Sequence, residues 1–296
     1  MTTFRSPAKP SITRRSFLAG SACAVGGVAL YSGEIARHWI DVSPRDVFLP
    51  GLPEAFDGFR IAQISDIHMD EFTEPFFIRD VVHRVNRLNP DAVVITGDFV
   101  TCEFAPQKFA IGAAWQCAEI LDQLTCRERY AVLGNHDVMI GAKEVTEALA
   151  AHGIAMLRNS YVPLERPAGR IWLAGLDDPV QGAPLPDVAI PESIRNRPRE
   201  PILLMCHAPD YADIVRLHPS CSSVALMLCG HAHGGQIRLP WIGAMVLPQM
   251  GRKYIEGWFR LGQMQLHVNR GIGSVGVPFR LNCPPEISLL TLRSAY

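Results

Sequence analysis

The sequence predicts an α/β fold, a layered sandwich of strands and helices. Short apolar runs alternate with helical patterns through the first half of the chain, and further apolar runs follow in the second half. The chain has 296 residues, of which 48% are hydrophobic, so it can bury a large core and is not mostly disordered. With 28 basic and 29 acidic residues, the formal net charge is −1, and we therefore expect no nucleic-acid partner.

Residues 1–33 are expected to be a twin-arginine signal peptide or a membrane anchor. A mild apolar run follows four basic residues with no acid among them, which are Arg5, Lys9, Arg14 and Arg15. Residues 13–19 resemble the twin-arginine export consensus, which implies the twin-arginine machinery as a partner. The alternative is a basic arm followed by a core helix, although the run is weakly apolar and falls short of the roughly 18 residues of a confident spanning helix. We expect an exported protein, in the periplasm or at the outer face of the cell membrane.

In the first half of the chain, three strands are expected, at residues 59–64, 92–96 and 130–133. Apolar residues recur at helical spacing over 76–88 and along one face of 109–124, and residues 143–152 are helical again. We expect Thr73 to cap the first of these helices, with Pro75 in its first turn.

In the second half, strands are expected at residues 171–174, 202–206, 224–229, 265–268 and 287–292. Residues 177–201 are rich in Pro and Gly and are interpreted as a long surface connection. We find no repeat and no second boundary, so residues 34–296 are expected to form one domain. None of the eight cysteines forms a Cys-x-x-Cys pair, which argues against a zinc ribbon.

Polar motifs follow five of the expected strands, where ligands bind in open α/β sheets. These motifs are Asp66-Ile67-His68, Gly97-Asp98, Gly134-Asn135-His136-Asp137, Cys206-His207 and Gly230-His231-Ala232-His233. Each motif alone is more often a turn, a cap or a structural histidine. Together they contain five of the ten histidines of the chain, which points to a shared site.

Carboxylates, imidazoles and an amide oxygen form a mixed ligand set that suits two divalent ions, with Mn, Fe, Zn and Co all open. Two ions that share one carboxylate need about four protein ligands each. Seven side chains meet this requirement if Asp98 is shared, namely Asp66, His68, Asp98, Asn135, His207, His231 and His233.

The order of these motifs resembles the signature of the calcineurin-like metallophosphoesterase superfamily, from about residue 59 to 292. The resemblance implies a four-layer sandwich with two central mixed β-sheets flanked by helices. It also implies that His136 is the catalytic histidine and that Asp137 orients it. It implies two metal sites, one formed by Asp66, His68, Asp98 and His233 and the other by Asp98, Asn135, His207 and His231.

Residues 230–236, 252–254, 269–273 and 282–286 resemble a bacterial exported branch that includes the YkuE-type phosphodiesterases. We expect a dinuclear phosphoesterase that cleaves phosphodiester or pyrophosphate bonds, with a metal-bridging hydroxide as the nucleophile and His136 as the proton donor. Some members of the wider branch cleave UDP-2,3-diacylglucosamine in lipid A synthesis, which gives a second hypothesis. A non-catalytic scaffold ranks last, because no ligand of the set is missing.

Residues 239–248 form an apolar segment directly after the last metal motif, and Arg252 and Lys253 follow it. Apolar residues beside cations suit a membrane surface or an acylated, lipid-linked phosphate substrate. The alternative is a buried β-hairpin. Phe72, Phe76 and Phe77 are expected to be core residues of the first helix, with the opposite lip of the cleft as the alternative.

Overall fold

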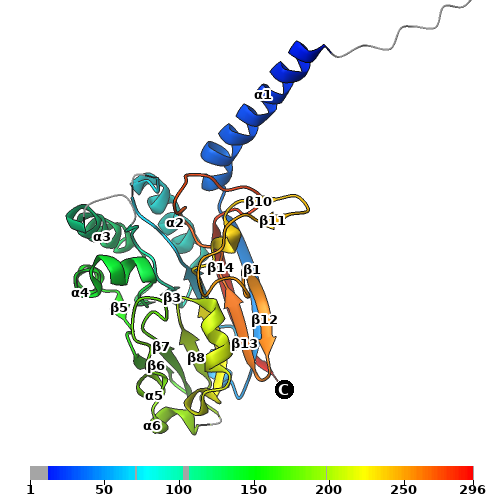
Figure 1. Cartoon of the computed structure of the whole chain (residues 1–296). Coiled ribbons are helices and arrows are strands. Elements are labelled where there is room, and N and C mark those ends of the chain that lie inside the picture. Colours follow the sequence, from blue (N-terminus) through cyan, green and yellow to red (C-terminus); the bar gives the residue numbers. More distant parts are fainter. Residues whose placement is uncertain (1–12, 71, 103–106, 198, 296) are drawn as a thin grey trace, which may run out of the picture.

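The computed structural model describes residues 13–70, 72–102, 107–197 and 199–295. Within these residues, two six-stranded mixed sheets pack face to face, and helices cover the outer face of each (Figure 1). This is the four-layer arrangement, so the predicted fold class is confirmed.

The first sheet carries most of the first half of the chain, together with the last strand. Its spatial order is β1 (Asp41–Pro50), β14 (Glu286–Ala295), β2 (Arg60–Ile64), β3 (Ala92–Ile95), β4 (Glu128–Ala131) and β5 (Ala155–Met156). Its outer face packs on α2 (Pro75–Leu88), α3 (Gln107–Leu121) and α4 (Asn135–Ala151). Strands β2 to β5 are parallel, so their carboxyl ends reach the same edge.

The second sheet carries the second half. Its spatial order is β12 (Gly257–Leu261), β13 (Met264–Val268), β9 (Val224–Cys229), β8 (Ile202–Met205), β7 (Gly169–Gly175) and β6 (Ser160–Arg166). The short helices α5 (Pro186–Ala189), α6 (Glu192–Arg195) and α7 (Ala212–Val215) cover its outer face. The inner faces of both sheets bury a common core that includes Ile61, Leu173, Leu203 and Leu290.

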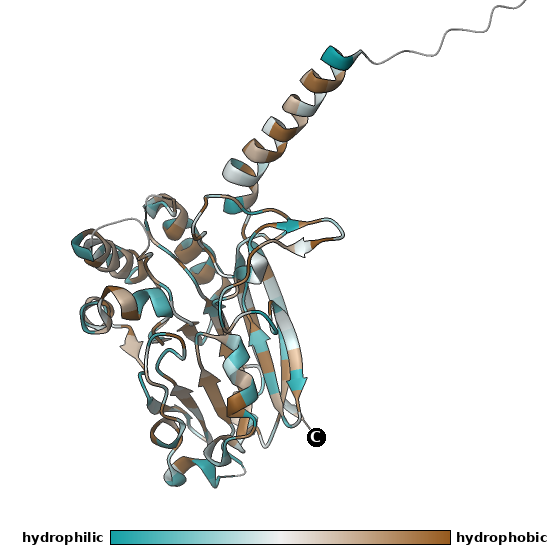
Figure 2. Cartoon of the chain, viewed as in Figure 1, coloured by the Kyte–Doolittle hydropathy of each residue, from teal (hydrophilic) through white to brown (hydrophobic). Residues whose placement is uncertain are grey.

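A separate helix precedes the domain. Helix α1 (Arg14–Leu30) begins after Thr13, whose hydroxyl oxygen accepts a hydrogen bond from the backbone N–H of Ser16. It buries none of its residues, so the alternative of a core helix is wrong (Figures 1 and 2). The helical stretch Arg14–His38 is long and apolar enough to cross a membrane by length and composition, a test that signal sequences also pass. Arg5 and Lys9 lie outside the described residues.

Several expectations need correction. Thr73 is buried and does not cap α2, because Glu74 occupies the cap position and Pro75 follows it directly. Phe77 is a core residue, as expected, whereas Phe76 is exposed. Helix α4 begins at Asn135 rather than at residue 143, with a kink at Gly141, because its first turn is built from motif residues.

The long connection at residues 177–201 is not a plain surface segment. It contributes α5 and α6, and its Ala189, Ile190 and Ile194 belong to the core on the outer face of the second sheet. Strands β1, β6 and β12 were not expected from the sequence. All three are edge strands, and their residues are mostly half-buried or exposed and lack a clear apolar run.

Candidate functional site

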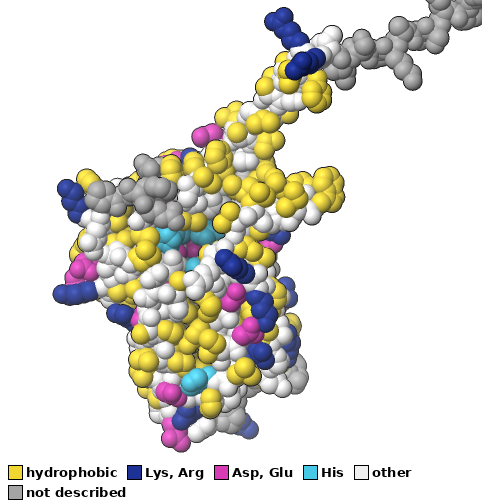
Figure 3. Space-filling view, in the orientation of Figure 1, with side chains coloured by type: hydrophobic (Ala, Val, Ile, Leu, Met, Phe, Trp, Pro, Cys, Tyr) yellow, Lys and Arg dark blue, Asp and Glu magenta, His cyan; other side chains and the backbone are white. Residues whose placement is uncertain are grey.

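The seven predicted ligands meet at one edge of the two sheets, where the strands of both sheets end. All except Asn135 are at most 5% exposed, and Asn135 is half-buried. Asp66 and His68 follow β2, Asp98 follows β3, Asn135 opens α4 after β4, His207 follows β8, and His231 and His233 follow β9. In Figure 3, histidine and acidic side chains of this region line a hollow on the surface.

One group of ligand atoms comes from Asp66, His68 and His233, which lie within 4.8 Å of one another. The Nε2 atoms of His68 and His233 are 3.0 Å apart, and Nε2 of His233 is 3.3 Å from Oδ1 of Asp66. Three ligand atoms therefore converge on one point, as a single cation requires.

A second group comes from Asp98, His207 and His231, again within 4.8 Å. Nε2 of His207 is 3.1 Å from Oδ2 of Asp98 and 3.1 Å from Nδ1 of His231. The same Oδ2 of Asp98 lies 3.5 Å from Nε2 of His68. Asp98 thus faces both groups of ligand atoms, and this position suits a carboxylate that bridges two ions.

The outer nitrogens of two rings are fixed by backbone carbonyls. Nδ1 of His207 donates to the carbonyl oxygen of Thr96 at 2.6 Å, and Nε2 of His231 donates to that of Gln249 at 2.7 Å. A metal ligand must be a neutral imidazole with one proton, and in that form the carbonyl takes the proton and the inward nitrogen of each ring is left as a lone-pair donor.

The structure allows a direct test of whether cations fit here. The buried Oδ1 of Asn135 has no hydrogen-bond partner among the described residues. A buried oxygen without a partner costs free energy, and coordination of a cation would remove that cost. An orphaned amide oxygen beside facing imidazole and carboxylate atoms is a donor set that suits divalent ions without thiolates. The residues therefore fit two divalent metals.

Burial and mutual charge shift the pKa values of the ligands. Burial raises the pKa of Asp66 to about 6, and burial lowers the pKa of His68 to about 3 and that of His231 to about 4. Burial also favours neutral Asp98, but the charges of His207 and His136 outweigh it and hold the pKa of Asp98 well below its usual range. His68 and His231 are therefore neutral at pH 7, the form that coordinates metals.

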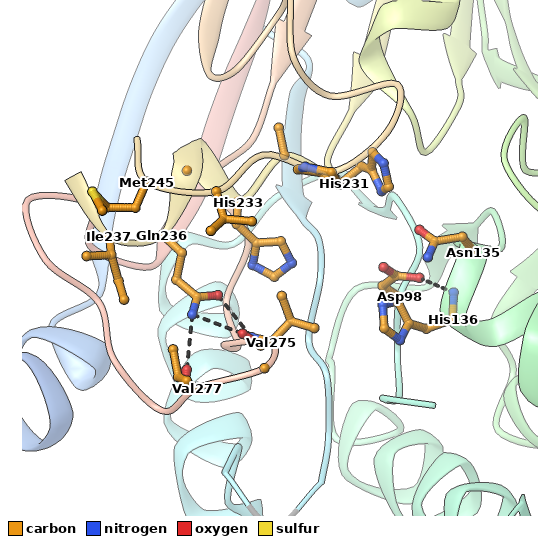
Figure 4. Close-up of a pocket in the computed structure, with 15 residues that line it drawn as sticks. Asp98, Asn135, His136, His231, His233, Gln236, Ile237, Met245, Val275 and Val277 are labelled. Atoms are coloured by element: carbon orange, nitrogen blue, oxygen red, sulfur yellow. Dashed lines mark hydrogen bonds between the residues drawn. The ribbon is translucent and has the colours of Figure 1, made fainter. Parts of the chain in front are cut away.

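The predicted catalytic His136 lines the pocket at the start of α4 (Figure 4). The ring Nδ1 accepts a hydrogen bond from the backbone N–H of Cys102 at 3.1 Å. The backbone N–H of His136 donates to Oδ1 of Asp98 at 2.9 Å. These contacts fix both the ring and the first turn of the helix beside the ligands.

Asp137 was expected to orient the His136 ring, and its contacts indicate a different task. Its carboxylate accepts three backbone hydrogen bonds, from Asp98 at 2.8 Å, Phe99 at 2.9 Å and Gly134 at 2.9 Å. Asp137 therefore joins the loop after β3 to the start of α4 and holds the backbone of the predicted metal ligand Asp98. The His136 ring is held instead by the backbone N–H of Cys102.

A pocket of about 470 Å³ opens from the ligands toward an apolar wall. Figure 4 shows Asp98, Asn135 and His136 on one side and Ile237 and Met245 on the other. Val246, Val275 and Val277 complete the apolar wall.

Two residues of the site were missed by sequence reasoning. The Gln236 amide donates to the carbonyls of Val275 and Val277 at 3.1 and 3.0 Å and so ties two walls of the pocket together (Figure 4). Arg280 is fully buried and donates to the carbonyl oxygens of Gly273, Arg270 and Cys283. Neither carries a local sequence signal, because both bind backbone carbonyls: Gln236 those of a loop about 40 residues later, and Arg280 those of its own loop.

Comparisons with known proteins agree with this geometry. Residues 59–235 match the profile of the calcineurin-like phosphoesterase family. The chain is 31% identical over 293 residues to "Uncharacterized metallophosphoesterase YkuE" of Bacillus subtilis, covering 96% of this chain and 98% of that protein. It is 30% identical over 288 residues to "Phosphodiesterase YaeI" of Escherichia coli, covering 95% and 99%.

The chain also resembles, more distantly, one protein named for its substrate and one protein of known structure. The chain is 25% identical over 302 residues to "UDP-2,3-diacylglucosamine pyrophosphatase LpxG" of Chlamydia trachomatis, covering 81% of this chain and 86% of that protein. The structure of NAD nucleotidase (NadN) of Haemophilus influenzae superposes with a TM-score of 0.50 at 15% identity. That superposition covers 72% of this chain and 45% of the nucleotidase, and it shows a shared fold only.

Proposed function

The chain belongs to the calcineurin-like phosphoesterase family, and we propose that it uses two divalent ions to hydrolyse a lipid-linked phosphodiester or pyrophosphate of the cell envelope. It is a metal-dependent phosphoester hydrolase, as its relatives are named. The observation that carries the dinuclear proposal is the pair of ligand groups that share Asp98, completed by the orphaned oxygen of Asn135.

We assign one ion to Asp66, His68, Asp98 and His233, and the other to Asp98, Asn135, His207 and His231. When bound, two such ions neutralise the phosphoryl oxygens and activate a water for attack on phosphorus. Mn, Zn and Fe all suit these ligands.

His136 supplies the proton in this proposal. Because its Nδ1 accepts the Cys102 N–H, the proton of the neutral ring sits on Nε2. That proton can be given to the leaving oxygen, or can hydrogen-bond to it as negative charge develops. Asp137 acts as a positioning residue through the backbone of Asp98 and Gly134.

The lipid-linked substrate is supported by the two-sided pocket, in which ligand residues face an apolar wall formed in part by Ile237, Met245 and Val277. A phosphoester oxygen at the ions would place an attached acyl chain against this wall. The similarity to LpxG supports UDP-2,3-diacylglucosamine as an alternative substrate, because that molecule joins acyl chains to a pyrophosphate.

We further propose that residues 1–33 are a twin-arginine signal or uncleaved anchor and that residues 34–296 act outside the cytoplasmic membrane. Arg14 and Arg15 begin α1, and basic residues before a spanning segment remain on the cytoplasmic side. The domain after the helix would then lie at the outer face.

The test is a panel of substrates given to the purified full chain with Mn or Zn: a phosphomonoester, a water-soluble phosphodiester, a glycerophospholipid and UDP-2,3-diacylglucosamine. We expect turnover of the phosphodiester and of one lipid, and loss of both in Asp98→Asn. Release of UMP from the nucleotide-linked lipid alone would favour the alternative. No hydrolysis of any of the four substrates with either metal would support the non-catalytic scaffold and refute the proposal.

A further inference from the structure

The β10–β11 hairpin, Arg238–Leu239 paired with Gly243–Ala244, carries large apolar side chains into solvent. We define the apolar tip as four exposed residues, namely Trp241 and Ile242 in the turn of the hairpin and Met245 and Val246 directly after β11. These residues are 103%, 72%, 55% and 80% exposed, respectively, so the alternative of a buried hairpin is wrong. Figure 3 shows the tip as an apolar projection beside the hollow of the site.

The base of the hairpin is firmly held, so the exposure of the tip is built into the fold. The Arg238 N–H donates to the carbonyl of Leu281 at 2.9 Å, and the Asn282 amide donates to the carbonyl of Arg238 at 2.9 Å. Met245 N–H donates to the carbonyl of Ile237 at 3.1 Å, across the hairpin. A loop that only covered the core would turn these side chains inward.

The loop that holds the hairpin also holds the base of α1. In the π-helical turn Tyr31–Ile35, which directly continues α1, Ser32 accepts a hydrogen bond at its carbonyl from the Arg280 N–H at 3.0 Å, and Gly33 packs against the ring of Phe279. Residues 275–282 thus join the helix to the hairpin, and both lie at the same end of the domain (Figure 1).

We propose that the apolar tip inserts into a lipid bilayer beside α1 and docks the mouth of the site on the membrane surface. A helix that crosses the bilayer places everything joined to its base at that surface. Trp, with an apolar ring and a polar N–H, is enriched where membrane meets water. Exposed Phe17, Leu18 and Val25 of α1 require the same apolar surroundings as the tip.

The tip is continuous with the pocket, since Met245 and Val246 belong to both. A lipid could leave the bilayer along these two side chains and bring its phosphoester to the ligands without exposing its acyl chain to water. This route rests on the proposed lipid-linked substrate, whereas the docking itself does not.

Docking can be measured without any hydrolysis. The full chain and its Trp241→Phe variant are reconstituted into phosphatidylethanolamine–phosphatidylglycerol vesicles with brominated or plain acyl chains, and the fluorescence difference isolates Trp241. We expect brominated chains to remove most of this component and aqueous iodide to leave it. The matched control is Trp115→Phe, because Trp115 is 43% exposed on α3 and its component should respond to iodide.

A Trp241 component that iodide quenches and brominated chains do not would overturn the proposal. Protection from both quenchers, together with dimers in detergent, would assign the tip to a second copy of the chain and would also overturn it.

The consequence for turnover is tested with the Trp241→Glu, Ile242→Glu double variant. We expect a loss of at least about tenfold in hydrolysis of lipid embedded in vesicles, because two apolar groups leave the bilayer. Hydrolysis of bis(p-nitrophenyl) phosphate should stay unchanged. Equal rates of native and variant chains on the embedded lipid would refute the route. If the native chain hydrolyses neither substrate, the proposed function fails while the quenching result stands.

Discussion

Gly230 is the point at which one added methyl group should disable a metal site. It follows β9 and precedes His231, and its N–H donates to the carbonyl of His207 at 3.0 Å. A Cβ at this position would overlap Oδ2 of Asp66 and Oγ of Ser65, and would lie 2.8 Å from Cβ of Ser65. The Ser65 hydroxyl can rotate away, but its Cβ cannot move without the backbone.

The Asp66 carboxylate has little freedom to yield. Both of its oxygens lie 2.9 Å from the backbone nitrogen of His231 and accept its N–H, and Oδ1 is 3.3 Å from Nε2 of His233. Relief of the overlap therefore needs a shift of about 1 Å in a ligand or in the end of β9. Overpacking of this kind costs about 1–3 kcal/mol, and a misplacement of about 1 Å can cost roughly 10²-fold in rate.

We therefore expect Gly230→Ala to lose about one bound ion per chain, to lose roughly 10²-fold in kcat, and to unfold several degrees lower. Metal analysis after gel filtration, steady-state kinetics and thermal unfolding measure the three quantities. The matched control is Gly112→Ala in α3, where a Cβ meets nothing within 4 Å and should add about 0.5–1 kcal/mol of stability. Native metal content and activity in Gly230→Ala would refute the assignment of Asp66 as a ligand.

Three further predictions test separate parts of the structure. His136→Ala should lower kcat by about 10²–10⁴ with metal content retained; an unchanged rate would remove His136 from the mechanism. Asp137→Ala should cost about 3 kcal/mol or more in urea unfolding, because three buried N–H groups lose their acceptor; lower kcat with unchanged stability would restore the ring-orienting role. Burial lowers the pKa of His267 to about 4, so its favourable share of stability is complete above pH 6.5 and is lost as pH falls toward 4. His267→Gln should therefore lose about 2 kcal/mol less than the native chain between pH 7 and pH 5 in urea unfolding, and identical losses would contradict this linkage.

The ligand motifs could be predicted because each follows a short apolar strand. Strands β2, β3 and β4 are parallel, as are β8 and β9, so their carboxyl ends reach a common edge. That rule brings Asp66 and Asp98 together on the first sheet and His207 and His231 together on the second, and the packing of the two sheets then joins the pairs. It could not show which backbone groups each side chain also binds, and the true contacts of Asp137 were missed for that reason.

Edge strands were the main part of the fold that the sequence did not reveal. Strand β1 contains Pro44, Arg45 and Asp46, and only Val47 and Leu49 are buried. Its place is set by parallel pairing with β14, more than two hundred residues later, as in the pair Asp41 and Glu286. A pattern read over a few residues cannot contain that pairing. The exposure of Trp241 was undecided for a related reason, because burial depends on what the fold places beside a side chain.

The left-handed backbone of the ligands shows what imposes the geometry of the site. Five of the seven have positive φ, namely Asp66, His68, Asp98, His231 and His233. At about 1 kcal/mol or more each, this strain is on the order of 5 kcal/mol, comparable with the lower range of the stability of a whole domain.

Strain of this size persists only where the surroundings enforce it. The β2–β3 pairing continues past both strands into the site, with hydrogen bonds from Asp66 N to Gly97 O at 2.9 Å and from His68 N to Asp98 O at 3.0 Å. Across the second sheet, Gly230 N bonds to His207 O at 3.0 Å. The ligands are thus held by extensions of the two sheets. The free energy gained by burying the cores of these sheets offsets the backbone strain. The two sheets thus help to set the ligand arrangement, and this support lowers the cost of ordering the site around the ions.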